Sequence, residues 1–308
     1  MSSPENSEVS LLDVVEVPDL LEQLGGATLV SLLGAAPRLR DIAKGLKIRI
    51  DNFRQLEKLS ERLSTFTVDA LDKDLIGYGK SAILVGNFKS LWIVLNSLQD
   101  ATSINQPHGA CGHTLLDLAT RRMDYRAVKL LFTHGATATV VDCTQHTPLH
   151  HAARNGHIQL VATLTKVSDV NAQNKWGKTP LHIAAEKGHA DCVRFLIERG
   201  ANVNIEGNVY QNTPLHMAAE KGHLACVELL VKTESINLRN RLGYSPLHLA
   251  AMGGHAQCVT FLIDQGANVN NVANNLQTPL RSIITRIRDQ RYSEVHEILI
   301  IHGAVERL

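Results

Sequence analysis

The chain has few aromatic residues, and neither sign of charge prevails among its 308 residues. Aromatic side chains make up 4 % of the sequence and apolar residues 44 %, so a real core must be built mainly from Ala, Leu and Val. Such a core suits many small, closely packed helices and argues against a large sandwich or barrel. The net charge of +1 argues against a dedicated nucleic-acid-binding protein, which would carry a strong excess of basic residues.

Long apolar segments are missing as well. No run approaches the roughly 18 apolar residues of a membrane span. The N-terminal residues MSSPENSEVS contain neither a basic region nor an apolar one, so they do not form a signal peptide. Five cysteines at wide spacing fit neither a disulfide framework nor a zinc site. We therefore expect a cytoplasmic protein, with a nuclear location left open, that binds no metal or cofactor.

A motif of four residues returns along the chain at nearly constant spacing. It reads TPLH at 147–150, 179–182 and 213–216, SPLH at 245–248, TLLD at 114–117 and TPLR at 278–281. Successive Thr or Ser residues of the motif are separated by 33, 32, 34, 32 and 33 residues. In the four units with TPLH or SPLH, a Gly-His pair begins nine residues after the Thr or Ser. A constant period of this length indicates an array of stacked repeats.

Each repeat carries the signals of two short helices. Thr179 is a favoured N-cap residue, and Pro180 suits the first helical turn. Gly188 can end the first helix in a left-handed conformation, and Gly200 ends a second helix with apolar residues at helical spacing. The segment after Gly200 is expected to return as an extended hairpin toward the next TPLH. Helices this short are marginal alone, so neighbouring repeats must bury their apolar faces.

The period and the pattern T-P-L-H-x-A-A-x-x-G-H resemble the ankyrin repeat. The resemblance covers about residues 77–308 and implies an all-α dominated solenoid, in which each unit joins a helix-turn-helix to a β-hairpin. We expect six or seven repeats, with a degenerate first repeat at 77–105 and a last repeat at 278–308 that caps the stack. In the repeat from Thr114, Asp117 stands in place of the usual histidine and leaves the local hydrogen bonding open.

The first 76 residues differ in character from the repeats. They contain 13 Asp and Glu against nine Lys and Arg, a net charge of −4, whereas the rest of the chain carries +5. We expect residues 1–10 to be disordered and residues 11–76 to form a helical N-terminal region. Residues 17–43 resemble an F-box through Pro18, several leucines and the run Arg38–Leu39–Arg40–Asp41–Ile42–Ala43. This region therefore either caps the open end of the stack or docks to a ubiquitin-ligase subunit.

The regular placement of histidine and cysteine argues against catalysis. Eight of the 15 histidines occupy the TPLH and Gly-His positions, and in TPLH we expect the histidine to hydrogen-bond the Thr side chain and neighbouring backbone. Cys192, Cys226 and Cys258 each lie 13 residues after their repeat's Thr or Ser, as equivalent apolar positions of the second helices. Cys111 and Cys143 lie elsewhere, and an enzyme would have to use one of them as its reactive thiol. We expect no enzyme activity.

The resemblance implies a protein partner, bound at the hairpin tips and on the first-helix face of the stack. Trp176, Tyr210 and Leu242 each lie three residues before a Thr or Ser of the motif, and Tyr244 directly precedes Ser245. Because interfaces favour aromatic anchors, we expect these four residues to bind the partner. The basic residues beside them favour an acidic partner: Lys175, Lys178, Arg239 and Arg241. Alternatively, Trp176 and its neighbours pack on adjacent hairpins and stabilise the stack. We expect no nucleic-acid or membrane partner.

The resemblance also implies a modification. In ankyrin-repeat proteins a hairpin asparagine can be hydroxylated when a leucine lies eight residues earlier. This spacing occurs here at Leu196–Asn204, Leu229–Asn237 and Leu262–Asn270. Asn204, Asn237 and Asn270 are therefore candidate hydroxylation sites, although asparagine is also a residue that simply tolerates such a turn.

Overall fold

The computed structural model describes residues 68–98, 103–107, 112–139, 141–207, 209–231, 235–286 and 288–305. The segments predicted to be disordered (1–10) and F-box-like (17–43) lie outside these residues, as does Cys111. The described residues belong to two compact units, one within 1–106 and 126–136 and the other within 107–125 and 137–308.

The first unit contains α5 (Val68–Val85), α6 (Phe88–Ser97), the short 3-10 helix η2 (Ser103–Asn105) and most of α8 (Tyr125–Thr133). Helices α5 and α6 pack on each other. Asn87 caps α6, because its side chain accepts a hydrogen bond from the backbone N of Ser90 at 3.0 Å. The amide of Asn105 donates to the carbonyl of Gly135 at 3.0 Å and ties η2 to the segment after α8. Helix α5 continues through residue 77, where the sequence predicts that the repeats begin.

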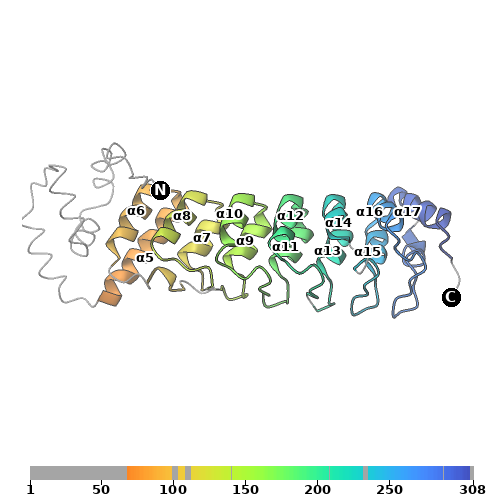
Figure 1. Ribbon diagram of the computed structural model, residues 1–308, viewed down its shortest axis with the longest axis horizontal. Helices are drawn as coiled ribbons and strands as arrows, with labels where there is room; N and C mark the ends of the chain where they lie inside the picture. The colour runs from red at the N-terminus through yellow and green to blue at the C-terminus, as the bar shows by residue number, and fades with distance from the viewer. Residues whose placement is uncertain are drawn as a thin grey trace, which may run out of the picture. The chain divides into compact units, whose positions relative to one another are not determined.

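The second unit is a stack of helix pairs, one pair to a repeat. The first helices are α7 (Leu115–Arg121), α9 (Pro148–Asn155), α11 (Pro180–Lys187), α13 (Pro214–Lys221) and α15 (Pro246–Gly253). The second helices described in this unit are α10 (Ile158–Leu164), α12 (Ala190–Glu198), α14 (Leu224–Leu230) and α16 (Ala256–Asp264). The last repeat ends with the 3-10 helix η3 (Ile284–Arg286) and α17 (Gln290–Ile301). Neighbouring first helices lie side by side, and the second helices form an adjacent row (Figure 1).

The first helices begin and end at the residues that the sequence predicts. In α9, α11, α13 and α15, the N-cap Thr or Ser forms a capping box with the histidine three residues later, and proline opens the helix. The C-cap glycines have φ between 70° and 78°: Gly156, Gly188, Gly222 and Gly254. A Cβ atom on Gly188 would lie 2.6 Å from Nδ1 of His223, so a larger residue would displace the histidine of the next repeat.

Histidines join each repeat to the next one. In the TPLH motif, Nδ1 accepts hydrogen bonds from the backbone N and the hydroxyl of the N-cap residue. The Nε2–H group donates to a carbonyl of the following repeat at 3.0–3.1 Å, in the pairs His150–Lys178, His182–Asn212, His216–Tyr244 and His248–Gln277. The Gly-His histidines donate in the opposite direction, in the pairs His189–Arg154, His223–Glu186 and His255–Glu220. The structural role predicted for the TPLH histidines is confirmed.

The repeat from Thr114 closes its cap with a carboxylate. Oδ2 of Asp117 accepts hydrogen bonds from the backbone N and the hydroxyl of Thr114, at 3.0 and 3.1 Å. The backbone N of Asp117 donates in return to the Thr114 hydroxyl at 3.2 Å. The hydrogen bonding that the sequence left open is therefore a complete capping box, built on aspartate in place of histidine.

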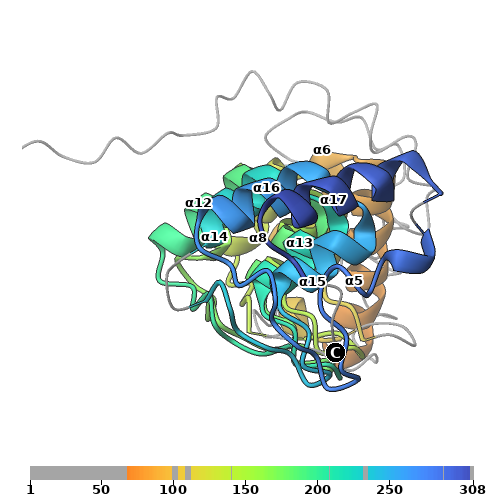
Figure 2. The ribbon, with the colours of Figure 1, turned by 90° about the vertical axis from the view of Figure 1, so that its right-hand side faces the viewer.

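A loop that we call a finger precedes each first helix from α9 onward and has a counterpart in the last repeat. The fingers comprise residues 142–147, 174–179, 207–213, 240–245 and 273–278, and they lie along one side of the first helices (Figure 2). Within the described residues no finger forms a β-strand, and in the third finger an isolated bridge pairs Gly207 with Asn212. Single backbone hydrogen bonds of 2.8–3.0 Å join adjacent fingers, in the donor–acceptor pairs Lys175–Thr144, Arg241–Tyr210 and Asn274–Leu242. The predicted helical solenoid is thus confirmed, whereas the expected hairpins are turns that lack a ladder of paired strands.

Candidate functional site

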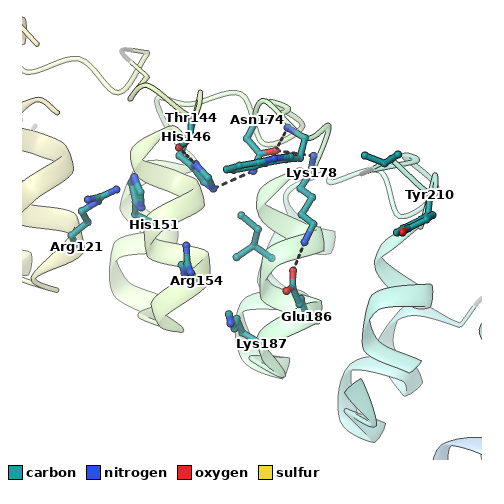
Figure 3. A pocket seen from close by; sticks show the side chains of 13 residues that line it. Arg121, Thr144, His146, His151, Arg154, Asn174, Lys178, Glu186, Lys187 and Tyr210 are labelled. Atoms are coloured by element: carbon teal, nitrogen blue, oxygen red, sulfur yellow. Dashed lines mark hydrogen bonds and ion pairs between the residues drawn. The ribbon is translucent and has the colours of Figure 1, made fainter. Parts of the chain in front are cut away.

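A groove of about 570 Å³ lies in the second unit, between the fingers and the first helices (Figure 3). The fingers contribute Thr144, His146, Asn174, Trp176, Lys178, Val209 and Tyr210. Helices α7, α9 and α11 contribute Arg121, His151, Arg154, Ile183, Glu186 and Lys187. Trp176 and Tyr210 thus lie on the finger side, and the basic side chains other than Lys178 lie along the helices.

A buried carboxylate holds the first finger beside the groove. Oδ1 of Asp142 accepts hydrogen bonds from the backbone N atoms of Thr144 and His146, both at 2.9 Å, and from the Thr144 hydroxyl at 2.6 Å. Its other oxygen accepts from Nη2 of Arg121 at 3.3 Å. Burial alone would raise the pKa of Asp142, but these hydrogen bonds lower it well below its usual range. Asp142 is therefore ionised at neutral pH and offsets the charge of Arg121.

Two stacked histidines cover this carboxylate. The rings of His146 and His151 are 5.3 Å apart at 25° to each other. Nε2 of His146 accepts from the Asn174 amide at 3.1 Å, and its Nδ1–H faces the Thr144 hydroxyl at 2.5 Å, which fixes a neutral tautomer. His151 is 4 % exposed, and its Nε2 lies 3.2 Å from Oδ2 of Asp142 without an aligned hydrogen bond. Burial, helped by the charge of Arg121, lowers the pKa of His151 to about 3, so this ring is also neutral.

Trp176 both packs on the stack and remains accessible. Its backbone N donates to Oδ1 of Asn174 at 3.0 Å, and its ring meets His146 edge-on with centroids 5.6 Å apart. The side chain is nevertheless 47 % exposed, and Tyr210 on the next finger is 52 % exposed. One edge of the ring therefore packs against histidine, as the packing alternative predicts, and the remainder is exposed to solvent. Partner binding by Trp176 stays a prediction.

The charged side chains leave the groove with an excess of positive charge. Nζ of Lys178 lies 2.6 Å from Oε2 of Glu186, so this pair is neutral as a whole (Figure 3). Glu186 is the one acidic residue among the groove residues. In the part of the chain that the structure describes, Arg154 and Lys187 form no ion pair within 4.0 Å. These two cations are available to an acidic ligand.

The predicted anchors fall into two groups. Trp176, Tyr210 and Lys178 line the groove, whereas Leu242 is 44 % exposed on a later finger. Tyr244 is half-buried, and its hydroxyl accepts a hydrogen bond from the amide of Asn275 at 2.8 Å. Tyr244 is thus engaged with the next finger.

The predicted basic residues outside the groove also differ from one another. Nε of Arg239 donates to the carbonyl of Gly243 at 3.2 Å, and its Nη2 donates to Oδ1 of Asn274 at 3.0 Å. The side chains of Lys175 and Arg241 are exposed and have no ion-pair partner within the described ranges. Of the predicted cations, Lys178 and Arg239 therefore support the fold, while Lys175 and Arg241 remain open to a partner.

Residue-by-residue interpretation of the sequence missed the side chains that shape the fingers. Asp142, Asn174 and Asn240 each accept hydrogen bonds from the backbone N atoms two and four residues later. All three lie five residues before the Thr or Ser of the next motif, and Asp and Asn favour turns of this kind. That spacing is a signal in the sequence. Arg121, His151 and Arg154 carry no comparable signal, because only the stacking of α7 on α9 brings them to the groove.

Two of the three candidate hydroxylation sites take part in contacts between repeats. Oδ1 of Asn237 accepts from the backbone N of Asn268 at 2.9 Å, and Oδ1 of Asn270 accepts from that of Val305 at 2.9 Å. Asn204 is exposed, and its backbone N donates to Oδ1 of Asn202 at 2.9 Å. Asn237 and Asn270 therefore join successive turns, whereas the bond of Asn204 lies within its own turn. The modification of all three stays a prediction.

The cysteines show how burial separates inert thiols from an accessible one. Burial raises the pKa of Cys192, Cys226 and Cys258 to about 11, so these thiols are protonated at neutral pH. Cys143 is exposed in the first finger.

Within the described ranges, no cluster of three or more His, Cys, Asp or Glu residues is arranged to hold a metal ion. The same ranges contain no helix with the length and apolarity of a membrane span.

Comparisons with known proteins agree with the geometry. The family model "Ankyrin repeats (3 copies)" matches residues 81–174 and 160–240, and the model "Ankyrin repeat" matches residues 242–275. Neither match includes residues 17–43, so the F-box resemblance gains no support from them. The chain is also similar to a solved structure, "Crystal structure of the ankyrin repeat domain of Bcl-3: a unique member of the IkappaB protein family". The identity is 27 % and the TM-score 0.61, over 72 % of this chain and 97 % of that one. No curated protein sequence matches the chain.

Proposed function

Because the chain belongs to the ankyrin-repeat family, we propose that it is a non-enzymatic module that holds an acidic protein partner against its fingers and its groove. Scaffold, adaptor and inhibitor roles all follow from such binding. The single observation that supports this surface most strongly is the exposure of Trp176 and Tyr210 at the edge of a groove with unpaired basic residues.

The chemistry of the surface is that of a binding hot spot. Aromatic side chains at the centre of an interface contribute most when they lie beside well-packed neighbours that exclude water. Trp176 meets this condition, because its ring rests on His146 and its turn is fixed by Asn174. Nearby positive charges would speed the approach of an acidic partner and disfavour a basic one.

The fingers are fixed before any partner arrives, which also favours binding. Each finger is joined to a neighbour by a backbone hydrogen bond, and the TPLH histidines tie the helices to the fingers beyond them. A preformed surface loses little conformational entropy on association, so more of the contact energy appears as affinity.

Capture from a cell lysate tests the proposal. We expect the wild-type chain to retain protein partners that the variant Trp176→Ala/Tyr210→Ala loses by about tenfold or more. Val272→Ala/Leu276→Ala is the matched control, because these apolar residues are 42 % and 65 % exposed, lie directly before and within the last finger, and do not line the groove. A thermal melt of each variant separates lost contacts from lost stability. Full retention of every partner by Trp176→Ala/Tyr210→Ala would contradict the proposed surface.

The F-box-like pattern of residues 17–43 supports a second candidate, a substrate-recruiting adaptor of a ubiquitin ligase. In that case the repeats hold the substrate and the N-terminal region docks to a ligase subunit. The full-length variant Leu20→Asp/Leu24→Asp changes two leucines of the pattern and leaves the groove intact. Loss of ligase subunits, with the other partners retained, would favour the adaptor. If the wild-type chain captures no ligase subunits, the adaptor function is contradicted.

A further inference from the structure

We infer that the groove recognises one extended acidic segment of a partner, in which an apolar residue and a carboxylate are about three to four positions apart. The inference rests on the proposed function and specifies the chemistry of the segment that the groove accepts. It follows from the unequal distribution of apolar and basic side chains along the groove.

The exposed apolar side chains of the groove are concentrated at its finger end. Trp176 and Tyr210 are about half exposed, and Val209 beside them is 68 % exposed. Ile183, in the first half of α11, adds an apolar side chain of the helix to the lining. An aliphatic or aromatic side chain of a partner that covers these residues would remove apolar surface from water on both sides.

The opposite end of the groove is basic. Arg154 and Lys187 lie in the last turns of α9 and α11, and Figure 3 shows them on neighbouring helices away from the fingers. Neither has an ion-pair partner among the described residues, whereas Lys178 is neutralised by Glu186, and Arg121 by Asp142. A carboxylate is therefore most favourable beside Arg154 and Lys187, where it meets two uncompensated charges.

The length of α11 sets the spacing. The helix has eight residues and is therefore about 12 Å long. An extended chain advances about 3.3 Å per residue, so three to four residues cover that length. A helical ligand would need about eight residues for the same distance. For an extended ligand, the two ends of the groove therefore contact side chains three or four positions apart.

Peptide binding measures this spacing directly. The probes are fluorescein-labelled peptides of Gly and Ser that carry one leucine and one Glu-Glu pair, in both orders and at separations from one to seven residues. Fluorescence anisotropy with the full-length chain should give the tightest binding at three or four residues, by about fivefold over the shortest and longest separations. Equal affinity at all separations, or no binding at millimolar peptide, would overturn the inference.

Substitutions at the basic end provide the second arm. Arg154→Gln/Lys187→Gln should weaken the best peptide about tenfold, because two favourable charge contacts are lost. Lys166→Gln/Arg194→Gln is the matched control, since both residues are exposed, belong to other elements and do not line the groove. The reversal Arg154→Glu/Lys187→Glu should instead bind the same peptide with Lys-Lys in place of Glu-Glu. Unchanged binding in the glutamine variant, or no such rescue, would contradict the inference.

The outcomes separate this inference from the proposed function. A captured partner could be lost with Trp176→Ala/Tyr210→Ala but kept with Arg154→Gln/Lys187→Gln. This result would support the proposed protein-binding surface and contradict the inferred recognition of an acidic segment. Displacement of the labelled peptide by unlabelled single-stranded polyuridylate at a lower concentration than by the same peptide without label would show a preference for nucleic acid and overturn the inference.

Discussion

At the scale of single residues, the fingertips show where the chain accepts a strained backbone. Gln145, Gln211 and Leu276 have φ of 58°, 59° and 62°, at the position where two other fingers carry Gly177 and Gly243. A residue with a Cβ atom in this region costs about 1–2 kcal/mol relative to its usual conformation. The fold accepts this cost because the turn must return the chain to the N-cap Thr or Ser two residues later.

Leu276→Gly should therefore stabilise the protein. Leu276 is 65 % exposed and loses little packing, so relief of the backbone strain outweighs the entropy of glycine, by about 0.5–1 kcal/mol. Urea unfolding followed by circular dichroism measures the change. Gly243→Ala should destabilise, because a Cβ atom there would lie 2.5 Å from Oδ1 of Asn274. A lower free energy of unfolding for Leu276→Gly would show that the leucine makes a stabilising contact.

A second prediction concerns Asp117, which is fully buried in its capping box. Burial raises the pKa of this carboxyl to about 6, above its ordinary value of 3.8. The folded state therefore holds the proton more tightly than the unfolded state, and stability falls as the pH rises through this range. Asp117→Asn should raise the free energy of unfolding at pH 7 by about 1 kcal/mol, and the gain should vanish near pH 4. A variant that is equally destabilised at both pH values would contradict this assignment.

At the scale of elements, the helix ends follow from local chemistry, and the sequence therefore predicts them. Thr179, Pro180 and Gly188 are sufficient to place both ends of α11, and equivalent residues do so in the other full repeats. The finger turns were predicted only as hairpins, because the hydrogen bonds between fingers join residues about 31 positions apart. The groove was predicted in part, through Trp176, Tyr210 and Lys178. The contribution of Arg121, His151 and Arg154 to the groove depends on the stacking of helices, which patterns in a single sequence do not specify.

The buried histidines of the TPLH and SPLH motifs predict that the protein loses stability in acid. Burial lowers the pKa of His150, His182, His216 and His248 to about 4, whereas an unfolded histidine has a pKa of 6.5. Because the unfolded state binds more protons below pH 6.5, stability should fall as the pH drops from 6.5 toward 4. The loss should be about 1–2 kcal/mol per histidine by pH 5.

Urea unfolding between pH 7 and pH 4.5 measures this loss. The background should be Asp117→Asn, because Asp117 titrates in the same range with the opposite sign. A free energy of unfolding that stays constant over this range would show that the histidines keep ordinary pKa values. Burial would then disfavour the charged imidazole of these four histidines less than their lack of exposed surface indicates.

At the scale of the repeat stack, the full repeats of the second unit share one set of caps and differ in the residues that they expose. Identical capping boxes and histidine contacts hold α9, α11, α13 and α15 in one arrangement, while the fingers and the exposed ends of these helices differ from repeat to repeat. The proposed function thus assigns recognition to other positions of the motif than those that form the caps. The groove residues are the clearest such departure, since Trp176, Arg154 and Lys187 have no role in the caps.

Hydrogen exchange on the complex with a captured partner tests the central claim most directly. Binding should slow exchange at the fingertips 174–178 and 209–211 and in the last turns of α9 and α11, and leave the second helices α10, α12 and α14 unchanged. Protection confined to the second helices, or to α5 and α6, would show that the partner binds elsewhere and would contradict the assignment of the fingers and groove as the binding surface.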